Sequence, residues 1–179
     1  MSSWKPMVEQ LVGERSARLL GYGIVLVGSP ADAEDLLHDA IVKTFGRGRR
    51  FPHVNAAEQY VRRTMQTLAI DRHRSRAAFR RAVDRDLPPV EGRSDDLDTP
   101  LDVEEALGHL SPRERVCVMM RFYDDMTTAA IASQLGLADG TVKRYLSNAY
   151  EKLAPLLRLD EDWSVLPETI SVTSKGERL

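Results

Sequence analysis

Apolar positions recur along most of the chain at intervals of three and four residues, which is the spacing of one buried face of an α-helix. No segment alternates apolar and polar residues over several positions, apart from a weak hint at residues 171–173. The pattern therefore predicts an all-α protein. The broadest apolar stripe lies between residues 33 and 45 and consists of Ala33, Leu36, Leu37, Ala40, Ile41, Thr44 and Phe45.

Local start and stop signals bound the helix that carries this stripe. Ser29 is suited to the N-cap and Pro30 to the first helical position, while Gly46 and Gly48 predict the end of the helix. A second helix is expected from Ala56 to about residue 76 or further.

In the second helix, Asn55 is the predicted N-cap, with Glu58 three residues further on as in a capping box. The expected core face consists of Val61, Met65, Leu68 and Ala69. The arginines of this helix are expected on its solvent side, at Arg62, Arg63, Arg72, Arg74 and Arg76.

The C-terminal half carries a full capping box, with Ser111 as N-cap and Glu114 at the third helical position. A short helix is expected to open at Thr127 or Thr128, and Gly136 breaks it. A third helix follows over 140–157. A short helix, a glycine turn and a second helix form a helix-turn-helix arrangement.

The third helix has two distinct faces. The inward stripe consists of Val142, Leu146, Ala149 and Leu153. The outward residues of its first turns are Thr141, Lys143, Arg144, Ser147 and Asn148. A recognition helix contacts base edges in the major groove from this position, although a generic three-helix packing unit remains an alternative.

The segment between the two halves has the composition of a linker, with three prolines and an acidic cluster in residues 86–102. We therefore predict two small helical domains, at 7–83 and 103–158, joined by an acidic flexible linker at 84–102. Residues 159–179 form a C-terminal tail whose role the sequence does not indicate.

Charge is strongly segregated although the formal net charge of the chain is only −2. Residues 47–81 carry a net charge of +8, all of it from arginine, and residues 84–105 carry −7. Guanidinium groups match phosphate geometry, so the basic block favours a polyanion partner. Phe51 and Tyr60 lie among these arginines, where they could stack on unpaired bases or serve as ordinary packing residues.

Several function classes lack their sequence signals. No apolar run approaches the length of a membrane span, the N-terminus lacks the order of a signal peptide, and Cys117 is the single cysteine, expected to be a buried apolar residue. The four histidines lack metal-ligand spacing, and there is no glycine-rich phosphate loop. We expect a cytoplasmic protein that is not an enzyme and binds no metal or cofactor.

Two motifs resemble a known family. Residues 127–137 and 140–146 resemble region 4 of bacterial sigma factors, and also the DNA-binding domain of LuxR-type regulators. Residues 32–45 resemble sigma region 2.2, and 57–64 with 68–74 resemble regions 2.3–2.4. Both motifs in this order, without regions 1.1 or 3, are similar to the extracytoplasmic-function (ECF) group of the sigma-70 family.

This resemblance implies a sigma factor that binds core RNA polymerase, through the β′ clamp helices and the β flap, and directs transcription initiation. It would read the −10 and −35 elements of promoter DNA, and an anti-sigma factor is a further partner that the family suggests. The alternative is a LuxR-type helix-turn-helix regulator that binds DNA without being a polymerase subunit.

The resemblance, together with the base-reading arguments above, implies three sets of site residues. Core polymerase would be bound by Asp35, His38 and Asp39. The −10 element would be bound by Phe51, Tyr60, Arg62, Arg63, Thr67, Arg72 and Arg74. The −35 element would be bound by Thr141, Lys143, Arg144, Ser147 and Asn148. This chain has His38, Thr67 and Tyr150 where the family usually has Gln, Asn and Arg.

Overall fold

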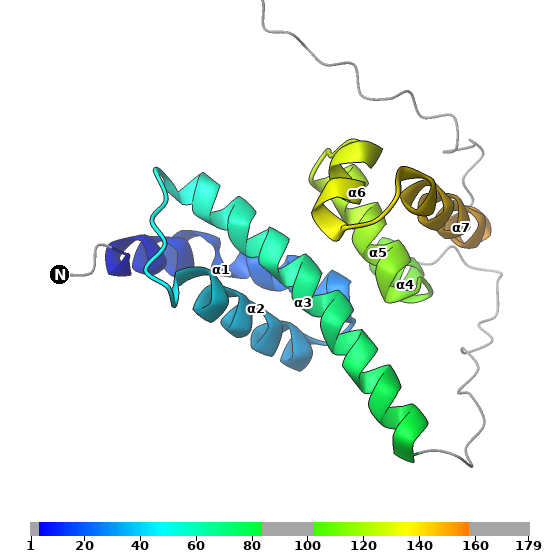
Figure 1. Ribbon diagram of the computed structural model, residues 1–179, viewed down its shortest axis with the longest axis horizontal. Helices are drawn as coiled ribbons and strands as arrows, with labels where there is room; N and C mark the ends of the chain where they lie inside the picture. The colour runs from blue at the N-terminus through cyan, green and yellow to red at the C-terminus, as the bar shows by residue number, and fades with distance from the viewer. Residues whose placement is uncertain (1–3, 84–101, 158–179) are drawn as a thin grey trace, which may run out of the picture.

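The computed structural model of the protein describes residues 4–83 and 102–157. Over these residues all regular secondary structure is helical, which confirms the predicted all-α class. The predicted linker, apart from Asp102, and the predicted tail lie outside the described residues. The described helices form two groups, α1 to α3 and α4 to α7, which lie side by side (Figure 1).

The N-terminal group consists of α1 (Lys5–Val27), α2 (Pro30–Phe45) and α3 (Val54–Val83), which pack pairwise around one core. The predicted core face of α3 is confirmed, with Leu68 half-buried and the other three residues buried. Within this group, α1 is the one helix that the local sequence signals did not predict. It is continuous over 23 residues and begins without a side-chain cap. Its buried residues include Leu11, Leu19 and Leu26.

Helix α2 begins and ends where its local signals predict. The Ser29 hydroxyl accepts a hydrogen bond from the Asp32 backbone N–H at 3.4 Å, and Gly46 follows the last helical residue. Within the apolar stripe, Leu37 and Ile41 are only half-buried, while the other five residues are buried. The core-facing side of α2 is therefore centred on Leu36, Ala40 and Thr44.

The prediction that Asn55 caps α3 is wrong. The helix begins two residues earlier than expected, at Val54, and the His53 Nδ1 accepts from the Ala56 N–H at 3.1 Å. The Asn55 Oδ1 instead accepts from the Arg15 Nη2 of α1 at 3.2 Å. Glu58, the expected capping-box partner, is buried and pairs with Arg15 (3.5 Å) and with a second α1 arginine (3.4 Å). Tertiary pairing with α1 engages Asn55 and Glu58, and His53 caps the helix locally in place of Asn55.

The C-terminal group contains α4 (Val103–Gly108), α5 (Pro112–Val118), a π-helical segment (Met119–Tyr123), α6 (Thr128–Leu135) and α7 (Asp139–Leu157). Sequence signals anticipated the last two helices and the start of α5, but not α4 or the π-helical segment. A π-turn inside a helix is rare and shifts the side chains that follow it.

The predicted capping box at the start of α5 is confirmed. The Ser111 hydroxyl accepts from the Glu114 N–H at 3.4 Å, and the Glu114 carboxylate accepts from the Ser111 N–H at 2.8 Å. Burial favours a raised pKa at Glu114, but its bonds to Lys152 and Ser111 outweigh it and hold that pKa below its usual value. The carboxylate thus links α5 to the far end of α7.

The helix-turn-helix arrangement is also present. Thr127, rather than Thr128, is the N-cap of α6, and its hydroxyl accepts from the Ala130 N–H at 3.1 Å. Gly136 has φ 64°, a left-handed conformation that glycine adopts without a steric penalty. The Leu137 N–H then bonds the Ala132 carbonyl at 2.9 Å, which closes α6 and aims the chain into α7.

We expect the Cys117 thiol to resist alkylation in the native protein at mildly alkaline pH. Burial raises its pKa to about 12, and the side chain has no exposed surface. Since only the thiolate reacts, labelling with iodoacetamide should occur only after unfolding in urea. Mass spectrometry of the native and unfolded protein measures this, and rapid native labelling would contradict the packing of α5.

Candidate nucleic-acid interface

The predicted polymerase-binding face lies on α2, where Asp35, His38 and Asp39 are all exposed. The structure brings them together on one side because they are three and four residues apart on a helix. Asp39 also bonds Arg72 of α3 at 2.6 Å. Asp39, predicted to bind polymerase, is therefore paired with Arg72, predicted to bind the −10 element.

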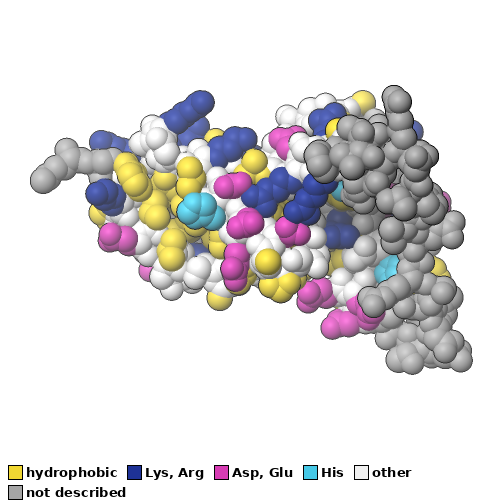
Figure 2. Space-filling view, turned by 90° about the horizontal axis from the view of Figure 1, so that it is seen from below, with side chains coloured by type: hydrophobic (Ala, Val, Ile, Leu, Met, Phe, Trp, Pro, Cys, Tyr) yellow, Lys and Arg dark blue, Asp and Glu magenta, His cyan; other side chains and the backbone are white. Residues whose placement is uncertain are grey.

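A second ion pair joins the same two helices. Asp32 accepts from both terminal nitrogens of Arg76, at 3.2 Å and 2.6 Å. The bond to Arg76 holds the pKa of Asp32 below its usual value. Viewed from below, acidic and basic side chains alternate across the middle of this face (Figure 2). The face is thus a mixture of both charges rather than a purely acidic patch.

An aromatic cluster, formed by Phe45, Phe51 and Tyr60, connects the core to the predicted −10 surface. The Phe45 and Phe51 rings are 5.4 Å apart in an edge-to-face arrangement, and the Phe51 and Tyr60 rings are 5.5 Å apart. The Arg49 guanidinium lies 4.3 Å from the centre of the Tyr60 ring. Phe51 and Tyr60 are both half-buried, so they pack and still leave part of their surface exposed to solvent.

The other predicted −10 residues follow α3. Arg63, Thr67 and Arg74 are exposed, and Thr67 lies seven residues after Tyr60, on the same side of the helix. The Thr67 hydroxyl donates to the Arg63 carbonyl at 3.2 Å. The expectation that Arg62 lies on the solvent side is wrong, because only 16% of its side chain is exposed.

The predicted −35 face is formed by the first turns of α7. Lys143 and Arg144 are exposed, while the remaining three residues of the set are half-buried. The stripe opposite is buried at Val142, Ala149 and Leu153 and half-buried at Leu146. The helix therefore presents its basic residues outward, as a recognition helix must.

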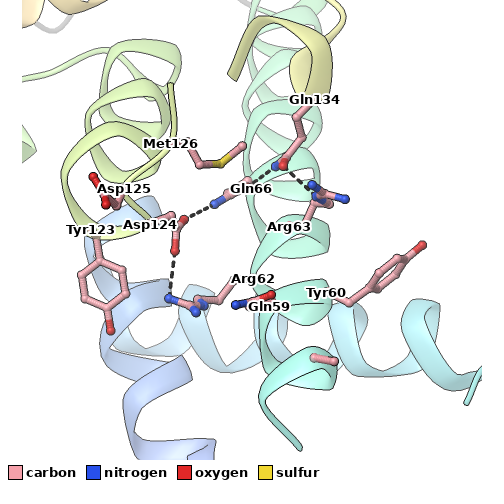
Figure 3. A pocket seen from close by; sticks show the side chains of 11 residues that line it. Gln59, Tyr60, Arg62, Arg63, Gln66, Tyr123, Asp124, Asp125, Met126 and Gln134 are labelled. Atoms are coloured by element: carbon pink, nitrogen blue, oxygen red, sulfur yellow. Dashed lines mark hydrogen bonds and ion pairs between the residues drawn. The ribbon is translucent and has the colours of Figure 1, made fainter. Parts of the chain in front are cut away.

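The structure also shows a polar site between the two helical groups, which sequence reasoning missed. A cavity of about 420 Å³ lies between α3 and the loop before α6, and Gln134 points toward it from α6 (Figure 3). Its polar lining includes Arg62, Arg63, Gln66 and Asp124. The local sequence around Asp124 carries no signal for this site, since its partners lie 58 to 102 residues away in the chain.

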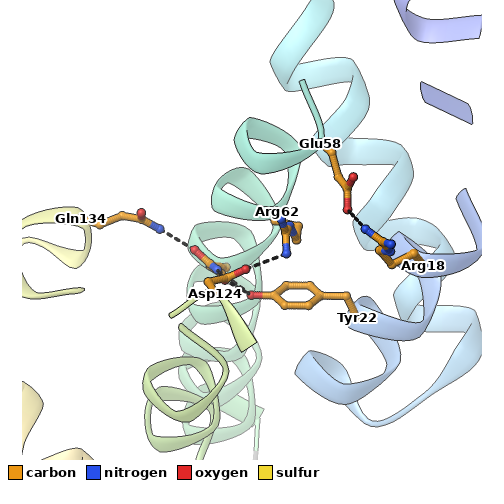
Figure 4. Close-up of polar contacts among 7 residues, drawn as sticks. Arg18, Tyr22, Glu58, Arg62, Asp124 and Gln134 are labelled. Carbon is orange, nitrogen blue, oxygen red and sulfur yellow. Dashed lines mark hydrogen bonds and ion pairs between the residues drawn. The ribbon is translucent and has the colours of Figure 1, made fainter. Parts of the chain in front are cut away.

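Asp124 is the centre of this site (Figure 4). Its carboxylate accepts from the Tyr22 hydroxyl at 3.0 Å, the Gln66 amide at 2.7 Å and the Arg62 guanidinium at 2.8 Å. Burial raises the pKa of Asp124, and Arg62 opposes that shift. Burial also raises the pKa of the Tyr22 phenol well above its usual value.

Over the described residues, none of the helices is long and apolar enough to cross a membrane. No group of three or more His, Cys, Asp or Glu side chains is arranged to hold a metal ion in that part of the chain.

Comparison with known proteins places this geometry in a family. Residues 101–153 match the family model for sigma-70, region 4. The chain is 31% identical over 147 residues to the RNA polymerase sigma-E factor of Streptomyces coelicolor, covering 81% of this chain and 82% of the relative. It is 30% identical over 158 residues to the ECF RNA polymerase sigma factor SigL of Mycobacterium tuberculosis, covering 82% and 86%.

A solved structure shares the fold. It is the co-crystal structure of the sigma factor RpoE with the anti-sigma factor NepR from Bartonella quintana, at a TM-score of 0.61. The match has 20% sequence identity and covers 90% of this chain and 100% of the matched chain.

The protein is therefore a bacterial RNA polymerase sigma factor by class. More narrowly, the chain belongs to the ECF group of the sigma-70 family. The LuxR-type alternative is not favoured, because the similarity extends over most of the chain and not only over the helix-turn-helix.

Proposed function

We propose that this protein binds core RNA polymerase through α2 and reads two promoter elements with α3 and α7. The observation that carries the proposal is the pairing, in one sigma-family chain, of an exposed basic recognition helix with an aromatic and arginine-rich helix. Each surface is small, so affinity comes from engaging both elements while the chain is held on a larger enzyme.

The polymerase-binding role is assigned to Asp35, His38 and Asp39, which project together from α2. The β′ clamp helices are the expected partner of this face, and the β flap is the expected partner of the C-terminal group. Within the family, an anti-sigma factor is a further candidate partner. The protein itself acts as a non-catalytic subunit, and its place of action is the cytoplasm, where polymerase meets the chromosome.

The −10 role is assigned to the aromatic cluster and the arginines of α3. Taking a base out of the stack costs a few kcal/mol, and stacking on an aromatic side chain returns about 1–3 kcal/mol per base. The half-buried rings of Phe51 and Tyr60 supply such a surface beside Arg49. The arginines nearby supply the sequence-independent contacts to phosphate.

The test is transcription in vitro from purified components. The chain with core polymerase should produce promoter-specific transcripts, whereas core polymerase alone should not. Binding to promoter DNA by the chain alone, with no effect on purified polymerase, would contradict the proposal and favour a free-standing DNA-binding regulator.

We expect Arg144→Ala to weaken use of promoters that contain a −35 element by about 1–3 kcal/mol, the contribution of one bidentate contact to a base. The side chain is exposed on α7, where it can reach a base edge. The measurement is transcription from a matched promoter pair with an intact or scrambled −35 element. Lys5→Ala, an exposed change at the start of α1, should leave the ratio unchanged.

A further inference from the structure

Tyr145 borders the face of α7 that is assigned to the −35 element. It lies four residues after Thr141 and three before Asn148, so the three side chains are neighbours on the surface of the helix. The Tyr145 ring is half-buried and packs against the apolar core. This packing orients the phenol, so its hydroxyl has a defined place beside the residues assigned to DNA.

The Tyr145 hydroxyl is bonded to an arginine of another helix. It accepts a hydrogen bond from the Arg113 Nη1 at 2.9 Å, and Arg113 lies 32 residues earlier in the chain, in α5. Helices α5 and α7 pack against each other (Figure 1). Glu114, which follows Arg113, accepts from Lys152 of α7 at 2.7 Å. The two contacts fix the first turn of α5 against α7 and hold the Arg113 guanidinium on the flank of the recognition helix.

The stability of α5 does not explain the positive charge of Arg113. The residue lies in the first turn of the helix, where the positive end of the helix dipole disfavours a cation. Within residues 4–83 and 102–157, no carboxylate lies at ion-pair distance from Arg113. A guanidinium has five N–H donors, and the Tyr145 hydroxyl accepts from one of its nitrogens. The remaining donors of this half-buried side chain are suited to an anion.

The Tyr145 ring contacts a second guanidinium. The central carbon of the Arg144 guanidinium lies 5.9 Å from the centre of the ring, within the range of a cation–π contact. Arg144 is likewise without a carboxylate partner in the described part of the chain. Two positive charges from different helices therefore meet at one phenol, and this concentration of charge favours a polyanion.

The position of Arg113 on the flank of α7 predicts a contact to phosphate rather than to a base. An α-helix with its side chains is about 10–12 Å across and the major groove is about 12 Å wide, so a recognition helix fills the groove. Phosphates of the two strands border the groove on either side. A cation on the flank of the helix meets this border, whereas the outward residues of the first turns meet base edges.

We propose that Arg113 is a further DNA-binding residue, which Tyr145 positions to contact a phosphate at the border of the −35 element. The surface that binds DNA then extends from α7 onto α5. This inference rests on the proposed function, since it takes α7 as the helix that enters the major groove. Arg113 contributes affinity that does not depend on base sequence, and Tyr145 acts as a positioning residue through its hydroxyl.

The test measures promoter binding by the holoenzyme, which is core polymerase with either the parent chain or Arg113→Met. The probe is a fluorescent duplex selected from random-sequence DNA with the parent holoenzyme, and anisotropy gives Kd over a series of salt concentrations. Methionine keeps the apolar stem of the side chain but not its charge. We expect about tenfold weaker binding, the effect of losing one charge-assisted hydrogen bond. The plot of log Kd against log salt should become less steep by about 0.9, which corresponds to one phosphate.

Tyr145→Phe is the second variant, because it keeps the ring and removes only the hydroxyl that accepts from Arg113. It should weaken binding in the same direction, and it should have no further effect when added to Arg113→Met. Lys5→Met is the matched control, since it removes one positive charge from an exposed residue at the start of α1. This control should match the parent in affinity and in salt dependence. Circular dichroism checks that each variant is folded.

Single-base changes in the −35 element of the probe separate a phosphate contact from base reading. Arg113→Met should lower the affinity for every probe by the same factor, so the preference among probes stays that of the parent. Arg144→Ala should instead reduce this preference at the position whose base it reads.

Parent affinity and parent salt dependence in folded Arg113→Met would overturn the DNA contact. Weaker binding with an unchanged salt dependence would also overturn it, because the residue would then act only through packing. Parent-like binding by Tyr145→Phe would overturn the positioning role. If the parent holoenzyme selects no promoter from random-sequence DNA, the proposed function is itself wrong, a result distinct from selection by the parent without an effect of Arg113→Met.

Discussion

Phe45→Ala is expected to lower the free energy of unfolding by about 3–5 kcal/mol, the usual cost of truncating a buried phenylalanine. The Phe45 side chain is 2% exposed and lies at the C-terminal end of α2. Truncation removes its apolar contacts and leaves a cavity that the surrounding helices fill only in part. It also removes the edge-to-face contact with Phe51, a kind of contact that adds about 0.5–1.5 kcal/mol beyond the buried area.

Urea denaturation followed by circular dichroism measures this effect. The midpoint should fall while the dependence of the free energy on urea stays the same. Val42→Ala is the matched control, because Val42 is on the same helix but 55% exposed, and a surface change of this kind stays within about 0.5 kcal/mol. Equal effects of the two substitutions would contradict the packing of α2 against the aromatic cluster.

Asp39→Arg is expected to reduce binding of core polymerase by more than about a hundredfold. Charge complementarity leads us to expect basic groups of polymerase opposite this acidic residue, and an arginine there would place like charges against each other, which costs several kcal/mol. The side chain of Asp39 is 55% exposed on the assigned polymerase face, next to Asp35 and His38. In the parent protein Asp39 pairs with Arg72, so the substitution also places two guanidinium groups side by side. Fluorescence anisotropy of the labelled protein titrated with core polymerase measures the loss.

Two controls separate the interface from the internal ion pair. Glu9→Arg makes the same change in charge on an exposed residue of α1 and should bind polymerase normally. The double substitution Asp39→Arg with Arg72→Asp restores an ion pair of reversed polarity between α2 and α3. If the double variant regains full polymerase binding, Asp39 acts through Arg72 and not through direct contact.

Helix boundaries set by neighbouring residues could be predicted from the sequence. Ser29, Ser111 and Thr127 each cap a helix through a hydrogen bond to a backbone N–H three residues ahead, so the sequence alone contains both partners. The turn at Gly136 is local in the same way, because the left-handed conformation it needs favours glycine. The two faces of α7 likewise follow from helical periodicity.

The start of α3 could not be predicted from neighbouring residues in this way. Asn55 and Glu58 have the spacing of a cap, but arginines of α1 lie close enough to compete for both side chains. A contact made across 40 residues of chain therefore overrides the local signal. Arg62 is a similar case, because helical periodicity places it toward solvent until a second helical group covers it.

The sequence by itself determined the helical class, the caps at Ser29, Ser111 and Thr127, the helix-turn-helix and the family, since each depends on residues a few positions apart or on motifs in a fixed order. Only the tertiary structure decided that Asp124, Tyr22, Arg62 and Gln66 meet. Tyr22, Arg62 and Gln66 lie 58 to 102 positions away from Asp124 in the chain. Asp124 itself follows a π-turn that no local pattern indicates. Packing of one helical group on the other creates this buried polar contact, and that packing depends on the shapes of both surfaces together.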